Sequence, residues 1–150
     1  MRHLEVAVIV PDRDVKQTYE VLCDFERYPD YSPEVRSVSV EANNGHKVSS
    51  WETDFRGGIL RWREIDTFDP DAGTIGFEQI EGDIEHFSGR WMIAGEGTGS
   101  LIRFSAQFDM GIPSLSSIID PIAEQALREN IIAILKGLFG PAVEILPPVA

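Results

Sequence analysis

Two arginines on one predicted strand are the first residues of this sequence whose types and spacing suggest chemistry. Arg61 and Arg63 alternate with Leu60 and Trp62. If the arginine face of this strand points inward, two fixed cations could polarise ketone oxygens and stabilise an enolate. If it points outward, the arginines are solvated and pair with some of the many acidic residues. The alternation leaves both orientations open.

Asn130 is the single residue whose position most strongly suggests a functional role. It lies within the apolar stripe of a predicted C-terminal helix, four residues from both Ala126 and Ile134. A buried amide must satisfy its donors and its acceptor or lose roughly 1–3 kcal/mol. We therefore expect Asn130 to bond either a carbonyl or hydroxyl group of a ligand, or a neighbouring strand.

Other reactive residue types are sparse. His86 could serve in acid–base chemistry, but its strand position is opposite to that of Phe87 and Trp91, which predicts an outward, structural role. Cys23 is the single cysteine, which excludes an intramolecular disulfide, and its helical context predicts a buried thiol. Because the three histidines are dispersed, we expect no metal site. The sequence implies no organic cofactor either.

Composition restricts the class of protein. Hydrophobic residues make up 43% and charged residues 25% of the 150 residues, which is typical of a globular domain. The net charge of −12 opposes binding to nucleic acids and to anionic membranes, because the arginines form no concentrated basic patch. No run of apolar residues is long enough to span a membrane. We expect one domain, residues 1–150, in the cytoplasm.

The periodicity of apolar residues predicts the order of elements. Alternation from Leu4 to Val10 predicts a first strand, and residues 15–31 suggest two short helices. Six more strands follow between residues 37 and 110, joined by short turns such as that at 43–45. A broad apolar face then predicts one long helix, Asp120–Phe139, with a proline at its first position.

This order predicts an α+β fold: a curved, seven-stranded antiparallel sheet wrapped around one long C-terminal helix, with two short helices after the first strand. One helix does not fill the concave face of so wide a sheet. We therefore expect part of that face to line a cavity for an apolar ligand.

Four stretches in this order resemble the START-like or Bet v 1-like superfamily: Tyr19–Pro29, Gly82–Trp91, Arg103–Met110 and Arg128–Asn130. Within it the chain is similar to the polyketide cyclase/dehydrase and lipid-transport group. The resemblance implies a helix-grip fold with a deep apolar cavity between the sheet and the long helix.

We consider three functions, of which the group implies the first two. The first is a polyketide aromatase/cyclase, which folds and dehydrates a poly-β-ketone presented by an acyl carrier protein. Asn130 and the Phe108–Met110 stretch favour this branch. The second is a non-catalytic carrier of an isoprenoid quinone or similar lipid, and the third is a stress-type regulatory binding protein. The oligomeric state stays open.

In the cyclase interpretation, Arg61 and Arg63 stabilise enolate oxygens and Asn130 orients a carbonyl group or water. The residues expected to contact the substrate are Tyr28, Phe87, Trp91, Phe104, Phe108 and Met110. Thr67 and Val35 stand where the cyclases have an arginine and a tyrosine that direct cyclisation. The family's usual catalytic residues are therefore not carried over.

Overall fold

The concave antiparallel sheet is the largest element of the protein. In the computed structural model, which describes residues 1–43 and 46–147, its strands have the order β2-β3-β4-β5-β6-β7-β1-β8. They are β1 (Arg2–Val10), β2 (Val35–Asn43), β3 (His46–Phe55), β4 (Gly58–Asp69), β5 (Thr74–Gly82), β6 (His86–Glu96), β7 (Gly99–Asp109) and β8 (Glu144–Ile145). The seven expected strands are present, and β8 is a short eighth that the sequence did not indicate. Residues 44 and 45, the tip of the expected hairpin, lie outside the described residues.

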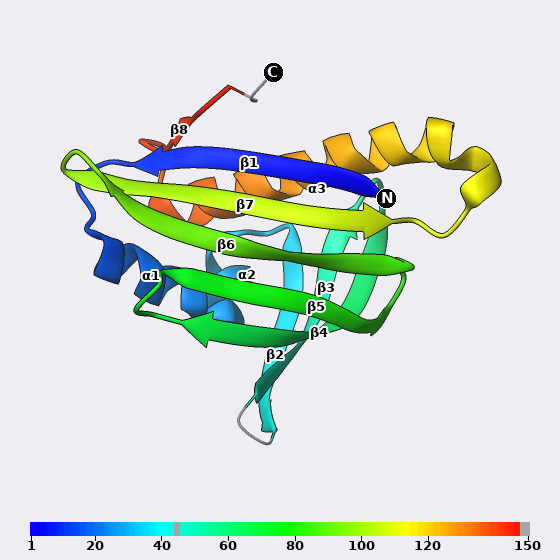
Figure 1. Cartoon of the computed structure of the whole chain (residues 1–150), viewed down its shortest axis with the longest axis horizontal. Coiled ribbons are helices and arrows are strands. Elements are labelled where there is room, and N and C mark those ends of the chain that lie inside the picture. The colour runs from blue at the N-terminus through cyan, green and yellow to red at the C-terminus, as the bar shows by residue number, and fades with distance from the viewer. Residues whose placement is uncertain (44–45, 148–150) are drawn as a thin grey trace.

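The helices lie on the concave side and at one end of the sheet. After β1 come α1 (Val15–Cys23), a 3-10 turn (Phe25–Arg27) and α2 (Tyr28–Tyr31). A second 3-10 turn (Pro113–Leu115) leads into the long helix α3 (Ser116–Phe139). In Figure 1, α3 runs along the sheet behind β1 and β7, while β2 and β3 cross the direction of β5, β6 and β7. This is the expected α+β helix-grip architecture.

The start of α3 corrects one expectation. The helix begins at Ser116, four residues before the predicted Asp120, because the 3-10 turn already sets its direction. Pro121 therefore lies inside the helix. It lacks the N–H that would bond to the carbonyl of Ser117, so its position costs one backbone hydrogen bond.

Alternation on the central strands builds the core. On β7, Ile102, Phe104, Ala106 and Phe108 are buried, whereas the intervening Arg103 and Gln107 are exposed. The buried residues face those of β1 and β6 in register, so that Phe104 is opposite both Val6 and Trp91. A rigid, fully paired sheet thus presents one apolar face to α3. No helix among the described residues combines the length and the apolar character that a membrane crossing requires.

Candidate functional site

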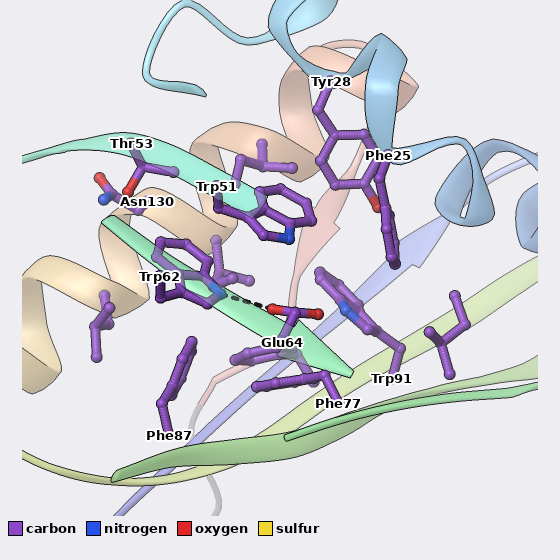
Figure 2. Close-up of a pocket in the computed structure, with 15 residues that line it drawn as sticks. Phe25, Tyr28, Trp51, Thr53, Trp62, Glu64, Phe77, Phe87, Trp91 and Asn130 are labelled. Carbon is purple, nitrogen blue, oxygen red and sulfur yellow. Dashed lines mark hydrogen bonds between the residues drawn. The ribbon is translucent and has the colours of Figure 1, made fainter. Parts of the chain in front are cut away.

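A narrow cavity lies between the concave face of the sheet and α3. About 620 Å³ of it, its opening included, is not filled by protein atoms. Its walls come from the segment after α1, from five strands and from α3, as Figure 2 shows. The lining residues are Phe25, Tyr28, Trp51, Thr53, Trp62, Glu64, Ile75, Phe77, Phe87, Trp91, Phe104, Leu127, Asn130, Ile131 and Ile134.

Aromatic rings dominate the walls. Eight of the lining residues are aromatic, and they include all three tryptophans of the chain. Trp51 and Trp62, from neighbouring strands, stack with their ring planes 1° apart and their centroids 5.6 Å apart. The rings of Phe87 and Trp62 pack edge to face, with their centroids 5.8 Å apart. These rings present flat faces and edges to the cavity, which suits a planar, conjugated molecule.

Two buried carboxyl groups share the inward face of β4. The side chains of Glu64 and Asp66, two residues apart on one strand, point to the same face of the sheet, and the residues are only 5% and 1% exposed. Glu64 lines the cavity, whereas Asp66 does not. In Figure 2 the indole Nε1–H of Trp62 donates a 2.7 Å hydrogen bond to Oε1 of Glu64.

Asp66 is held from the side of β3. The hydroxyl of Ser49 donates a hydrogen bond to Oδ2 of Asp66, and the indole N–H of Trp51 donates to that hydroxyl at 2.8 Å. Oδ1 of Asp66 is buried and accepts no hydrogen bond from an N–H group, or from a Ser, Thr or Tyr hydroxyl, of the described chain. Neither Glu64 nor Asp66 forms an ion pair with a described residue.

Burial controls the protonation of this pair. Loss of solvation, followed by the hydrogen bond with Asp66 and the charge of Asp66, raises the pKa of Glu64 well above its ordinary value. Burial also raises the pKa of Asp66, although hydrogen bonds from Glu64 and Ser49 and the charge of Lys47 oppose this. Two like charges so close in a desolvated site cannot both form readily. The pair therefore retains one proton well above the pH at which exposed carboxyl groups lose theirs.

The strand next to Glu64 is irregular. Arg63 pairs with Glu81 and Glu64 with Gln79, so Ile80 of β5 is an extra residue that has no partner on β4. Such a bulge bends the strand and changes the direction of its side chains, and bulges are common beside active sites. Here the bulge lies opposite the step from Arg63 to Glu64, the residue whose carboxyl group lines the cavity.

Of the two orientations left open for Arg61 and Arg63 the structure has the outward one, so the catalytic role expected of them in the cyclase interpretation is wrong. Both lie on the outer face of β4, where their side chains are 60% and 41% exposed. Nε of Arg61 lies 3.5 Å from Oε2 of Glu52, and Nη1 of Arg63 lies 3.1 Å from Oε1 of Glu81. The opposite face of β4, with Trp62, Glu64 and Asp66, points inward. It does so because the Trp62 indole packs there against the rings of Trp51 and Phe87.

Asn130 has the bond to a neighbouring strand that was one of the two roles expected for it, and its side chain also reaches the cavity. It lines the cavity, and its Nδ2 donates a 2.8 Å hydrogen bond to the backbone carbonyl of Asp54 at the end of β3. This is the only hydrogen bond of its side chain within the described chain, so one N–H and the amide oxygen stay free for a ligand. In Figure 2, Asn130 and Thr53 lie together at one side of the cavity.

The arrangement matches one known family. Residues 12–135 match the family described as polyketide cyclase / dehydrase and lipid transport. The chain belongs to this family. A comparison with curated proteins finds no significant match.

Solved structures of the same fold include an aromatase/cyclase and a START superfamily protein. A Thermus thermophilus protein has a TM-score of 0.82 at 24% identity, covering 91% of this chain and 94% of that one. The Zhui aromatase/cyclase of a Streptomyces species has a TM-score of 0.75 at 20% identity, covering 92% and 91%. A START superfamily protein of Mycobacterium smegmatis has a TM-score of 0.76 at 18% identity, covering 91% and 96%. At these identities the likeness establishes the fold, which is the one expected from the sequence.

Four of the six predicted substrate-contacting residues lie at the cavity of this polyketide cyclase family member. Tyr28, Phe87, Trp91 and Phe104 line it. Phe108 is fully buried in the core instead, and Met110 packs against that core from the end of the sheet. Both share the inward parity of Phe104, but neither lies at the part of the strand that the cavity reaches.

The sequence reasoning missed the carboxyl pair and half of the aromatic wall. Glu64 and Asp66 have the same strand parity as Trp62, so assigning that tryptophan to the core would have placed both acids inward. Trp51 and Phe25 were also not expected at the site. Their signal is weak, because an aromatic residue on a strand or turn is equally compatible with plain core packing.

The remaining reactive side chains stay outside the cavity. His86 bonds to the hydroxyl of Ser88 at 3.1 Å and does not line the cavity. Burial raises the pKa of the Cys23 thiol to about 11, which keeps it protonated and unreactive at neutral pH. In the part of the chain that the structure describes, no three His, Cys, Asp or Glu side chains are grouped to hold a metal ion.

Proposed function

We propose that this protein binds a poly-β-ketone or its cyclised product in the cavity and directs cyclisation and dehydration. The observation that carries the proposal is a narrow space walled by aromatic rings, with a few polar groups at fixed places. A flexible chain confined there is held in a folded, flat conformation. Holding reacting groups together in this way supplies much of the acceleration of such a ring closure.

The polar residues of the cavity suit an oxygen-bearing substrate. Only Thr53, Glu64 and Asn130 among the lining residues are neither aromatic nor aliphatic. The free N–H of Asn130 can donate to a ketone oxygen, while the rings bind the carbon skeleton. The arginines have no part in this proposal, because they face the solvent.

Co-expression with a minimal polyketide synthase and its acyl carrier protein tests this function. The expected result is a larger share of one regularly cyclised, dehydrated product than the synthase forms alone. Trp62→Leu should abolish this change, whereas Arg63→Gln, on the same strand but outside the cavity, should preserve it. A product profile that the wild-type protein leaves unchanged across several chain lengths would contradict the proposal.

A non-catalytic carrier of an isoprenoid quinone or lipid is the second candidate. The predominance of apolar lining residues favours it, and so does the inclusion of lipid transport in the family description. Mass spectrometry of lipids extracted from the purified protein distinguishes the two. A stoichiometric isoprenoid ligand that Trp62→Leu loses, together with an unchanged polyketide profile, would favour the carrier.

A further inference from the structure

We propose that Glu64 is the acid–base catalyst of this cavity and that it shares one proton with Asp66. The inference rests on the proposed function and names the group that performs its proton transfers. It is carried by the position of the two carboxyl groups: Glu64 is at the cavity wall, Asp66 is buried two residues further along the same face of β4, and neither forms an ion pair with a described residue.

Access distinguishes the two acids. Glu64 is 5% exposed and lines the cavity, so a bound ligand can reach its carboxyl group although bulk water scarcely can. Asp66 is 1% exposed and does not line the cavity. Both are on a strand paired on each side, and Trp62 and Ser49 fix one oxygen of each. A catalytic group needs this kind of rigid support.

A structural role explains the pair poorly. Burying two unneutralised carboxyl groups is unfavourable, and apolar residues of similar volume would commonly stabilise such a core more. The other titratable groups that act on the pair do not neutralise it. Tyr28 approaches from α2 with its hydroxyl bonded to the carbonyl of Leu22, and Lys47 of β3 lies over the ring of Phe68. Buried acids of this kind in a cleft are candidates for functional groups.

The shared proton defines the chemistry. When the proton is on Asp66, the Glu64 carboxylate removes a proton from the carbon between the ketone and the carbinol of a β-hydroxyketone. The electron pair of that C–H bond first forms the enolate. It then forms the C=C bond as the C–O bond breaks, and the hydroxyl group leaves with its electron pair. Glu64 returns its proton to this hydroxyl, so that water is released and the pair regains its one-proton state.

The experiment uses a simple probe, the aldol of benzaldehyde and acetone, whose dehydration gives the conjugated enone benzalacetone. Formation of the enone is followed by ultraviolet absorbance with wild-type protein, Glu64→Gln and Glu81→Gln. Glu81 is the matched control, because its side chain is 67% exposed on the outer face of the neighbouring strand. Binding of benzalacetone is measured separately by quenching of tryptophan fluorescence, and thermal unfolding verifies that each variant is folded.

We expect Glu64→Gln to bind benzalacetone within about threefold of wild type and to lose at least roughly a hundredfold in dehydration rate, the usual contribution of a general acid–base group. Glu81→Gln should match wild type in both. If Glu64→Gln dehydrates the probe as fast as wild type, or if wild type binds benzalacetone without accelerating dehydration, the acid–base role is wrong, although the binding function stands. If wild type does not bind benzalacetone, the proposed function fails as well.

Asp66→Asn supplies a second test that does not depend on Glu64→Gln folding. In the wild type only the one-proton state is active, so the rate should rise and then fall with pH. Without Asp66, Glu64 alone must lose its proton to act as the base. The rate of Asp66→Asn should then rise with pH to a plateau and lack the fall that the wild type shows at high pH, because the variant keeps only one of the two titrating carboxyl groups. An unchanged pH profile would overturn the role of Asp66.

Discussion

The indole Nε1–H of Trp62 donates a 2.7 Å hydrogen bond to Oε1 of Glu64, two residues further along the same strand. One alternation of β4 therefore places an aromatic ring and a carboxyl group together in the cavity. The same alternation turns Arg61 and Arg63 to the solvent. This orientation of β4 determines the chemistry of the cavity, because the buried acids Glu64 and Asp66 face inward and the two arginines do not.

Trp62→Phe should raise the pKa of Glu64 further, because the indole hydrogen bond stabilises the carboxylate and lowers that pKa. Leaving the buried oxygen without its donor should also cost about 1–3 kcal/mol of folding stability. The pKa can be measured from the NMR shift of the Glu64 carboxyl carbon during a pH titration. A pKa equal to that of the wild type would show that the hydrogen bond is not formed in solution.

The stability of the wild type should fall as the pH rises above the ordinary carboxyl range. The raised pKa values of Glu64 and Asp66 mean that the folded protein holds a proton that the unfolded chain releases above about pH 4. Stability is then lost as the pH rises toward the folded-state pKa. Urea unfolding between pH 4 and 9 should show a shallower decline for Glu64→Gln. Parallel curves for the two proteins would contradict the protonated pair.

Replacing both Arg61 and Arg63 by glutamine should change little. Their ion pairs with Glu52 and Glu81 are exposed, and such pairs contribute about 0–1 kcal/mol. We expect the affinity for benzalacetone and the rate of aldol dehydration to stay within about twofold of wild type. A tenfold loss of affinity or of dehydration rate would show that the arginines take part in binding or catalysis.

Asn130→Ala should separate the structural part of this amide from its ligand-binding part. Losing the hydrogen bond to the carbonyl of Asp54 should lower the free energy of unfolding by about 1 kcal/mol. Affinity for benzalacetone should fall about tenfold, equivalent to about 1.4 kcal/mol. A styrene hydrocarbon of similar size, which lacks the ketone, should bind as to wild type in fluorescence titrations. Equal losses for both ligands would assign Asn130 a structural role alone.

Gly137→Ala should destabilise the protein, although alanine is the better helix former by about 1 kcal/mol. A Cβ at Gly137 would collide with the backbone carbonyl of Tyr31, where α3 packs on α2. Separating the two helices would displace Tyr28 from the cavity wall. We expect a loss of about 1–3 kcal/mol in urea unfolding. Gly95→Ala is the control, because the nearest atom to its Cβ would be 3.8 Å away; a gain of stability in Gly137→Ala would contradict this packing.

The fold was predictable because its signals are local. Alternation in β1 and β7 and the broad apolar face of α3 are each visible within about ten residues, and their order restricts the topology. The start of α3 was misplaced because Asp120 and Pro121 form a typical helix start within a helix that the preceding turn had already begun. The edge strand β8, of two residues, has no periodic signal at all.

The site was less predictable because both faces of β4 mix apolar and charged residues. Leu60 and Trp62 share a face with Glu64, while Ile59 and Ile65 share the other face with Arg61. Only the three-dimensional packing of the two stacked tryptophans decides between these faces. Similarly, Phe104 and Phe108 have the same strand parity, but only Phe104 lines the cavity.

The most direct test of the cavity as the ligand site follows the three indole N–H signals in a two-dimensional proton–nitrogen NMR spectrum. Trp51, Trp62 and Trp91 are the only tryptophans in the chain, and all three line the cavity. Adding benzalacetone should shift all three signals in proportion to its occupancy. Glu64→Gln in the absence of ligand should move the Trp62 signal most, because that N–H donates to Glu64. Saturating ligand that leaves the indole signals unmoved while backbone signals elsewhere shift would contradict the account.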